Sequence, residues 1–476
     1  MWRFKKNINN PKYSNPLSLI DRILNKLNLS ETKKKVVRNL LWAVTGKIVT
    51  LLGSLLVGIF VARYLGPEQY GLMNYVVSYV ALFQVFASFG LDNIEIREEA
   101  KCKGTGEYGH TPSTEANTIL GTAFGLKLIF AAITMVLVIA TAWIFEADAF
   151  TKWMITLYSL SMIMQTFSVI RNYFTSIVWN EYIVKTEISR TLIGAGIKVV
   201  LLLLHAPLVW FIAATLFDTV LIAGGYLLSY RKKIASPRLW MFNKTTAKYL
   251  IKEAFPLLLS GAAVVIYQRI DQVMIGNMID KEAVGFFSVA TAFVGVLMFV
   301  PITLTDTYMP IISNLWNTDK EAYKRQNQQF MNITVWGTLL CSIVVCVLSY
   351  PLIRYTFGQQ YLPAVPILQV LAFKAVSVAF SSVAGKMIVA EGLQKWTILR
   401  DITGCIVCIL LNYLLLPRFG VIATAWIAIA SNLAAGYLSS IFIPAYRHTF
   451  VCQTRCLFFG WKDLTKIVSV AETKKL

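Results

Sequence analysis

The sequence predicts an all-α polytopic membrane protein, in which about twelve transmembrane helices form two pseudo-symmetric six-helix lobes around a central cavity. Three observations predict this fold class. Charged residues make up only 15% of the 476 residues and apolar residues 56%, whereas a soluble domain carries about 25% charged residues. Many apolar runs approach the roughly 20 residues that a helix needs to cross a bilayer. The second half of the chain also repeats motifs of the first half.

The first two apolar runs flank a short polar stretch, Ala62 to Gly71 (ARYLGPEQYG). Pro67 cannot continue a helix from within, and it biases Gly66 away from helical backbone angles. Two runs of membrane-spanning length joined by such a break predict a transmembrane helical hairpin.

Polar segments separate ten further apolar runs. The twelve predicted spans cover about residues 41–62, 72–91, 118–144, 153–178, 187–205, 208–230, 254–279, 283–309, 330–352, 363–390, 397–416 and 421–446. The segment 231–253 carries seven Lys and Arg residues and is the natural boundary between two lobes. We therefore predict a basic tail at 1–40, an N-terminal lobe at 41–230, a linker at 231–253, a C-terminal lobe at 254–446 and a second tail at 447–476. The first tail fits either an amphipathic helix on the membrane surface or a solvated segment.

An internal repeat predicts that the two lobes are related. Gly66-Pro67-Glu68-x-x-Gly71 matches Asp280-Lys281-Glu282-x-x-Gly285, which lies 214 residues later. Five residues of the fifth and sixth spans recur 210 residues later as identical residues. They are Glu181, Lys185, Arg190, Gly194 and Pro207, which match Glu391, Lys395, Arg400, Gly404 and Pro417. Repeats in the same orientation imply two lobes related by an axis along the membrane normal.

Lys and Arg residues predict the orientation of the chain. They gather in cytoplasmic loops of membrane proteins, and the basic loops at 92–117, 179–186, 231–253, 313–329 and 391–396 all lie on one side of the predicted topology. The opposite loops carry only Arg63, Lys152, Lys281, Arg354 and Arg418. Both termini are therefore predicted to be cytoplasmic. The net charge of +20 follows from this asymmetry, and we expect no nucleic-acid partner.

The sequence contains no motif typical of metal binding, of ATP binding or of catalysis by paired carboxylates. The seven cysteines and three histidines show no spacing typical of a metal site, and Cys405-x-x-Cys408 lies in a predicted helix. We see no Walker A loop and no pair of carboxylates on a large outer loop. We expect no cofactor, no metal and no direct use of ATP.

Ten charged residues lie inside the predicted spans, where charge is costly and usually faces a cavity or a partner. They are Lys47, Lys127, Arg171, Lys198, Asp218, Arg269, Asp271, Asp306, Lys374 and Lys386. Seven are cations and three are anions. A water-filled cavity lined by them would suit an anionic substrate, with phosphate or diphosphate as the obvious candidate. The alternative is that these charges form salt bridges within the bundle.

We therefore predict a cationic substrate-binding cavity. Its candidate residues are Arg269, Lys198, Lys374, Arg171, Lys47 and Lys386. Asp271 and Asp218 are the candidates for coupling to an ion. Arg269 and Asp271 are two residues apart and so point to nearly opposite faces of one helix. At most one of these two faces the cavity directly.

Three stretches carry a resemblance to a known family. They are ARYLGPEQYG with SFGLDNIEIREEAK, then IYQRIDQVMIGNMIDKEAVGFFSVA, and then LLNYLLLPRFGVIATAWIA. From about residue 40 to 445 the chain resembles the polysaccharide-exporter family, the Wzx-type O-antigen flippases. These belong to the multidrug/oligosaccharidyl-lipid/polysaccharide exporter superfamily, which has the MATE-like fold. By position, Arg269 and Asp271 correspond to the family's Arg-x-Asp pattern, and Asp92 and Arg97 to the pattern that closes its second span.

The resemblance implies a transporter and no enzyme. Its substrate would be an undecaprenyl-diphosphate-linked oligosaccharide, a repeat unit of O-antigen lipopolysaccharide or of a capsule. Its location would be the bacterial cytoplasmic membrane, and its mechanism alternating access coupled to a proton or sodium gradient. Other implied partners are membrane lipids, a polysaccharide polymerase and a chain-length regulator.

Two other functions stay open at the level of sequence. A multidrug cation antiporter of the same superfamily would favour acidic residues in the lobes. A membrane polysaccharide polymerase or glycosyltransferase would usually carry a large outer loop with catalytic residues, and the longest predicted outer loop, 351–362, has about a dozen residues.

Overall fold

The computed structural model describes residues 31–102 and 112–462, and every regular element within these ranges is a helix. The amphipathic helix predicted in the first tail falls mainly outside them. The first half contains α2 (Glu31–Ser88), α3 (Leu91–Lys101), α4 (Thr114–Phe145), α5 (Ala149–Ser159), α6 (Ser161–Gln165), α7 (Ser168–Ser176), α8 (Asn180–Leu203), α9 (Leu208–Lys233) and η1 (Pro237–Leu239). The second half contains α10 (Lys244–Met278), α11 (Lys281–Thr318), α12 (Lys320–Thr356), η2 (Gln359–Tyr361), α13 (Ala364–Leu371), α14 (Lys374–Ala390), η3 (Gln394–Trp396), α15 (Thr397–Phe419), α16 (Val421–Leu433), η4 (Ala434–Leu438), α17 (Ser439–Phe442), η5 (Pro444–Tyr446) and α18 (Arg447–Phe459).

The number of crossings agrees with the prediction. Ten segments of the described chain are long and apolar enough to cross a membrane. One of them, Val44–Lys101, includes both arms of the broken helix α2 and so supplies two crossings. The more polar helix α8 has 24 residues, which is also long enough to span a bilayer. About twelve crossings result.

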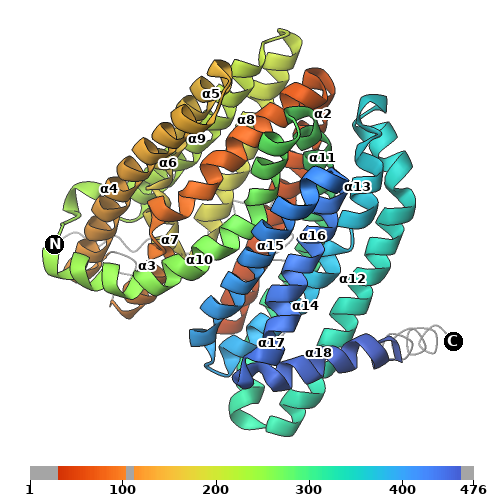
Figure 1. The fold of residues 1–476 in the computed structure, drawn as a ribbon. Helices are drawn as coiled ribbons and strands as arrows, with labels where there is room; N and C mark the ends of the chain where they lie inside the picture. Colours follow the sequence, from red (N-terminus) through yellow and green to blue (C-terminus); the bar gives the residue numbers. More distant parts are fainter. Residues whose placement is uncertain (1–30, 103–111, 463–476) are drawn as a thin grey trace, which may run out of the picture.

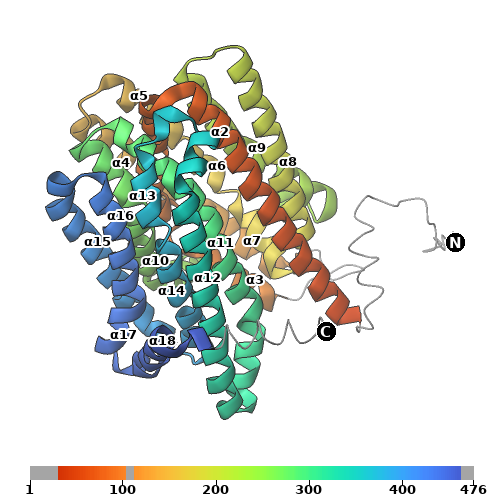
Figure 2. The ribbon, with the colours of Figure 1, turned by 90° about the vertical axis from the view of Figure 1, so that its right-hand side faces the viewer.

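The predicted hairpin is present in α2, which is broken at Gly66. This residue has φ 74° and ψ 170°, a conformation that glycine adopts readily because it has no Cβ atom. Pro67 then begins the second arm, where its missing N–H leaves no helical hydrogen bond unmade. Gly58 of the first arm and Tyr70 of the second arm line the same cavity, so the arms lie side by side. The turn is visible at the top of Figure 2.

The helices form two lobes. Figure 1 shows most of the first half, coloured red to yellow-green, on the left and most of the second half on the right, with the green helix α10 reaching across beneath the first half. The lobes meet mainly through α2 and α11. The largest buried cluster joins Val61 and Tyr75 of α2 to Phe287 of α11 and to Tyr361. The structure therefore has the predicted two-lobe architecture.

One helix of the second half packs against both lobes. Near the start of α10, Ala247, Leu250 and Ala254 are buried in a cluster whose other buried members come from the first half. Further along α10, Tyr267 packs against Cys408 of α15 in the second half. Pro256 lies between these two contact regions and within the helix. The predicted linker, residues 231–253, accordingly contains the last residues of α9, the helix η1 and the first turns of α10.

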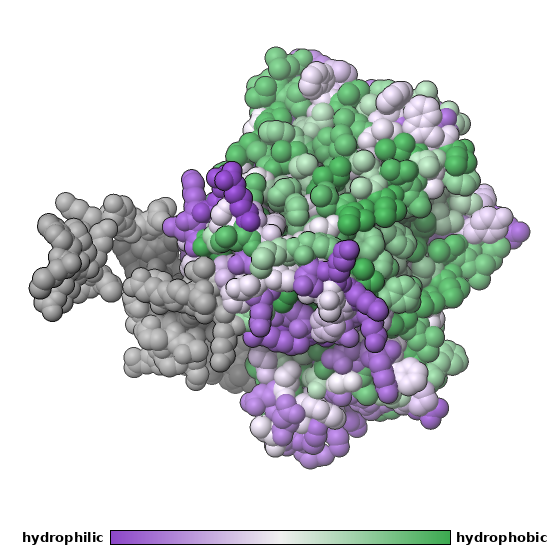
Figure 3. Space-filling model, turned by 90° about the vertical axis from the view of Figure 1, so that its left-hand side faces the viewer, coloured by the Kyte–Doolittle hydropathy of each residue, from purple (hydrophilic) through white to green (hydrophobic). Residues whose placement is uncertain are grey.

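The two ends of the molecule differ in character. We call the end with Gly66 the hairpin end, and the opposite end, with α3 and α18, the basic end. Figure 3 shows apolar surface over the upper part of one face and hydrophilic residues gathered toward the lower part, at the basic end. This distribution suits a bundle embedded in lipid whose basic end meets water.

The predicted second tail begins with a helix. α18 lies across the basic end at a steep angle to the spans (Figures 1 and 2). The indole of Trp336 donates a hydrogen bond to the carbonyl oxygen of Cys456 over 2.9 Å, and His448 Nε2 lies 2.7 Å from a carboxylate oxygen of Glu391. The hydrogen bond to Glu391 raises the pKa of His448. These contacts fix α18 to the second lobe.

Candidate functional site

Three adjoining cavities lie along the first lobe: the first also borders α10, the second also borders α11, and the third is lined by the first lobe alone. Their volumes are about 750, 720 and 230 Å³. The first and second cavities share Arg171 and Glu187, and the first and third share Arg190 and Asp218. We call the three together the interlobe cavity. It is the candidate substrate site because it is large and lies between the lobes.

Four of the six predicted substrate-binding cations line the interlobe cavity. They are Arg269 in the first cavity, Arg171 in the first and second, Lys47 in the second and Lys198 in the third. Lys127 and Arg190 also line it, which gives six cations against the three carboxylates of Asp92, Glu187 and Asp218. The lining is therefore cationic in total.

Some of these cations are paired within the first lobe. Lys198 Nζ lies 2.6 Å from an oxygen of Asp218, on the neighbouring helix α9. Arg171 Nε lies 3.7 Å from Glu187, a looser pair whose arginine side chain is half exposed. The expected salt bridges within the bundle thus exist, and they account for part of the buried charge.

Three cations of the cavity have no carboxylate partner in the described part of the chain. They are Lys47, Arg190 and Arg269. Lys47 Nζ lies 5.9 Å from the ring centroid of Phe299 on α11, a cation–π distance. The buried Nε of Arg190 has no hydrogen-bond partner. Unpaired cations in a cavity are the groups that an anionic ligand would neutralise.

Arg190 is the residue that the sequence reasoning missed. The sequence distinguishes it only as one of the repeated residues, matched by Arg400, near the start of a predicted span. In the structure it lies one turn beyond Glu187 on α8 and lines both the first and the third cavity. The available signal was its position among three charged residues in one stretch, Lys185 to Arg190.

Arg269 and Asp271 lie on opposite faces of α10, as their spacing predicts. Arg269 is exposed and lines the first cavity. Asp271 is 1% exposed and accepts hydrogen bonds from Asn412 Nδ2 at 2.9 Å and Cys408 Sγ at 3.3 Å, both on α15. Its other oxygen, Oδ2, is buried and has no partner.

The remaining two predicted cations, Lys374 and Lys386, do not line the interlobe cavity. Lys374 is buried at the start of α14 and is close enough to Asp271 to interact electrostatically with it. Lys386 Nζ lies 2.7 Å from Asp306 of α11. Both lysines therefore lie near carboxylates of the second lobe, Lys374 near Asp271 and Lys386 near Asp306.

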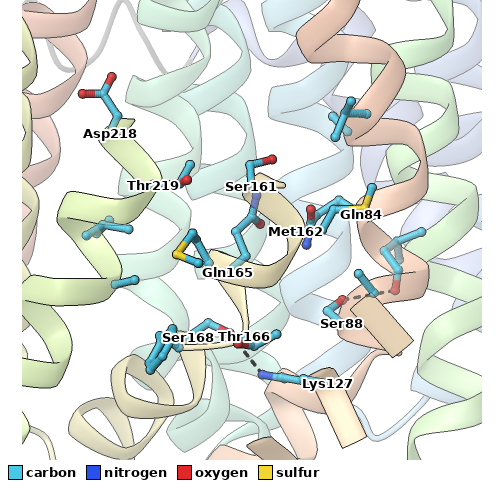
Figure 4. Close-up of a pocket in the computed structure, with 18 of the residues that line it drawn as sticks. Gln84, Ser88, Lys127, Ser161, Met162, Gln165, Thr166, Ser168, Asp218 and Thr219 are labelled. Atoms are coloured by element: carbon cyan, nitrogen blue, oxygen red, sulfur yellow. Dashed lines mark hydrogen bonds between the residues drawn. The ribbon is translucent and has the colours of Figure 1, made fainter. Parts of the chain in front are cut away.

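Lys127 forms a buried network at the edge of the first cavity. Its Nζ lies 2.7 Å from Asp92 and 2.8 Å from Glu95, both on α3, and it donates to the hydroxyl of Ser168 at 3.2 Å. Asn172 Nδ2 also donates to Asp92, at 2.9 Å. Figure 4 shows Lys127 beside Ser168, with Gln165, Ser161 and Asp218 further along the same wall.

Replacing Lys127 with alanine is expected to lower the free energy of unfolding by about 3–5 kcal/mol, because Glu95 would be left buried without its cation. Chemical denaturation of the purified protein in detergent measures this change. Lys324→Ala is the control, since Lys324 pairs with Glu321 on the exposed surface and such a pair contributes about 1 kcal/mol at most. Equal losses in the two variants would contradict a structural role for the network.

Direct contact between the lobes closes the cavity at the hairpin end. A methyl group on Gly71 would overlap the carbonyl oxygen of Lys281, and one on Gly285 would overlap that of Pro67. The two copies of the repeated motif therefore touch each other through their backbones.

Side chains seal the same region. The Tyr75 hydroxyl donates to Asn277 Oδ1 at 2.5 Å, Ser78 bonds to Gln272, and the Tyr361 hydroxyl donates to the carbonyl oxygen of Ala62 at 2.9 Å. In this conformation a substrate could not reach the interlobe cavity from the hairpin end.

Two related lobes around a polar, charged cavity define a polytopic membrane fold, and solved structures with a similar fold are known. The chain is similar in fold to the lipid II flippase MurJ in an inward closed conformation, with a TM-score of 0.66 and 14% identity over 88% of this chain and 91% of that chain. It is also similar to an inward-facing multidrug resistance MATE family transporter of the MOP superfamily, with a TM-score of 0.64 and 15% identity over 85% of this chain and 96% of that chain.

The family follows from the sequence comparison. The model of the family described as polysaccharide biosynthesis protein matches residues 36–316, and the chain belongs to this family. An uncharacterized membrane protein of Methanocaldococcus jannaschii is 22% identical over 412 residues, which cover 83% of this chain and 81% of that protein. The expected resemblance to a polysaccharide exporter family is thus confirmed.

Proposed function

We propose that this transporter flips an undecaprenyl-diphosphate-linked oligosaccharide, a repeat unit of O-antigen or of a capsule or exopolysaccharide, from the cytoplasmic to the outer leaflet. The observation that carries the proposal is the set of unpaired cations Lys47, Arg190 and Arg269 in a cavity between two lobes. Membership of the polysaccharide biosynthesis protein family supports a glycan substrate.

The proposed substrate has three parts with different needs. The diphosphate is anionic, and arginine binds phosphate oxygens through paired N–H groups. The glycan is polar and needs a hydrated lumen, which the polar cavity wall provides through Gln84, Gln165 and Ser161. The lipid chain can remain in the bilayer beside the protein.

Membrane potential can help to drive this movement. Moving one elementary charge through 100 mV is worth about 2.3 kcal/mol. A diphosphate with two negative charges that moves outward is therefore favoured by a potential that is negative inside. Transport would need no dedicated ATPase.

The second candidate, a multidrug cation antiporter, is favoured by the similarity to MATE structures. The charges argue against it, because six cations and three carboxylates line the interlobe cavity and would repel a cationic drug. We therefore prefer the anionic, lipid-linked substrate.

For ion coupling, Asp271 is the better of the two predicted carboxylates. Asp218 is already paired with Lys198. Asp271 is buried with Oδ2 unpartnered, and Oδ1 of its neighbour Asn412 is buried and unpartnered as well. These two buried oxygen atoms, which have no hydrogen-bond partner, could bind a proton or a sodium ion.

We also propose that the basic end faces the cytoplasm of a bacterial cell, and that a polysaccharide polymerase and a chain-length regulator are further partners in the inner membrane. A reporter enzyme fused after residue 240 is expected to show a cytoplasmic position, and one fused after residue 358 a periplasmic position. The charge asymmetry of the loops is the reason. The reverse pattern would overturn the orientation.

Transport itself can be tested with purified protein in liposomes. A fluorescent undecaprenyl-diphosphate oligosaccharide is placed in both leaflets, and a membrane-impermeant reagent reports the fraction that becomes accessible from outside. We expect the protein to accelerate exchange between the leaflets for this lipid and to have little effect on a neutral glycolipid with the same glycan. Equal acceleration of both lipids would contradict recognition of the diphosphate, and no acceleration of either would contradict a flippase.

A further inference from the structure

The helix α3 carries three carboxylates on one face. Asp92, Glu95 and Glu99 follow one another at spacings of three and four residues, which places them in line along a helix. Asp92 is half exposed at the cavity edge, whereas Glu95 is fully buried and Glu99 is 3% exposed. The line thus runs from the cavity into the interior of the first lobe.

Only two of these carboxylates have a cationic partner. Lys127 contacts Asp92 and Glu95, and its third contact is the hydroxyl of Ser168. Both carboxylate oxygens of Glu99 are buried and have no hydrogen-bond partner. Within the described chain no cation contacts Glu99, although an ionised carboxylate in such a place is costly unless it is paired.

Of the described groups around Glu99, Lys127 is the one cation, and it already contacts Asp92 and Glu95. The groups are Glu95, Cys102, Lys127, Tyr173, Ser176 and Tyr230. The Ser176 hydroxyl donates to the carbonyl oxygen of Tyr173, and the Tyr230 hydroxyl accepts a hydrogen bond from Trp240. Glu95 adds negative charge nearby.

From this geometry we propose that Glu99 is a proton-binding site of the first lobe, occupied by a proton when the hairpin end is closed. A proton neutralises the carboxylate without bringing a second cation close to Lys127, whereas a metal cation would be repelled by that lysine. Movement of α3 relative to α7 and α9 would expose Glu99 to water and release the proton. Glu99 would bind this proton whatever substrate the chain carries.

The proposal can be tested with dicyclohexylcarbodiimide, an apolar reagent that adds to protonated carboxyl groups in apolar surroundings. The carboxyl oxygen bonds to the central carbon of the reagent, and the carboxyl proton moves to its nitrogen. An ordinary glutamate has a pKa of about 4.3 and is ionised at pH 7. We expect the purified full-length protein at pH 7 to carry an adduct on the α3 peptide, located at Glu99 by peptide mass spectrometry, with labelling at this position that falls as the pH is raised.

The matched variants are Glu99→Gln and Glu98→Gln. Glu98 lies on the same helix but pairs with Arg97 and Lys101, so Glu98→Gln should label as the wild type does and Glu99→Gln should lose the adduct on the α3 peptide. If Glu99→Gln fails to fold, the mapped site and pH dependence of the wild-type adduct still decide. No adduct at Glu99, or labelling that does not change with pH, would overturn the proposal. Labelling that sodium chloride suppresses at constant pH, and that choline chloride does not, would replace the proton with sodium.

Discussion

Replacing Arg190 or Arg269 with glutamine is expected to abolish transport of the lipid-linked glycan while the protein remains folded in the membrane. Both arginines line the first cavity, and neither pairs with a carboxylate of residues 31–102 or 112–462, so their loss leaves no buried acid of these ranges uncompensated. A hydrogen bond to a charged group contributes about 1.5–3 kcal/mol, which corresponds to roughly ten- to hundredfold weaker binding of the diphosphate. Surface glycan in a complemented null strain, together with the liposome assay, measures the effect.

The second lobe offers the matched control for Arg190. Arg400 is its repeat partner, but the guanidinium of Arg400 lies 3.1 Å from the carboxylate of its neighbour Asp401, and the residue does not line the interlobe cavity. We expect Arg400→Gln to retain most transport. If the Arg190 and Arg269 variants both assemble normal surface glycan, the cavity does not bind the diphosphate as proposed.

Leucine at Gly71 or Gly285 is expected to hold the hairpin end open and to stop transport. Each glycine lies against backbone atoms of the opposite lobe, and overpacking of such a contact costs about 1–3 kcal/mol or more. The closed state would lose that much stability relative to any state in which the lobes separate at this end. Spin labels at the exposed positions Glu68 and Gln359, on opposite lobes of the hairpin end, measure the separation, and the distance between them should increase.

Gly196→Leu is the control for this experiment. Gly196 lies on α8, where an added Cβ atom would meet no atom within 4 Å. This variant should keep both the wild-type label distance and transport. An unchanged distance in the Gly71 and Gly285 variants would show that the two backbones can separate slightly without opening the end.

Much of the fold could be predicted because the membrane imposes simple rules on the chain. The break at Gly66-Pro67, the span lengths and the repeat all reflect local constraints that need no knowledge of tertiary contacts. The opposite placement of Arg269 and Asp271 followed from helix geometry alone. The structure confirms the fold class for the same reasons.

The site could be predicted only in part, because partners from distant helices decide which charges stay free. Nothing near Lys198 in the sequence indicates that Asp218 would neutralise it, or that Lys386 would meet Asp306. Arg190 was not recognised because its place in the cavity depends on how α8 packs beside α9 and α2. Which of these groups bind substrate remains a prediction.

The packing of α10 against both lobes limits how the molecule can move. Because Leu250 packs with residues of the first lobe and Tyr267 with residues of the second, we expect this helix to act as a hinge and the lobes to stay together on its side. Bending would concentrate near Pro256, where the ring removes a helical hydrogen bond. The lipid chain of the proposed substrate would therefore extend into the bilayer on another side, and we expect it to do so through the second cavity, which Lys47 of α2 and Ala292 of α11 border.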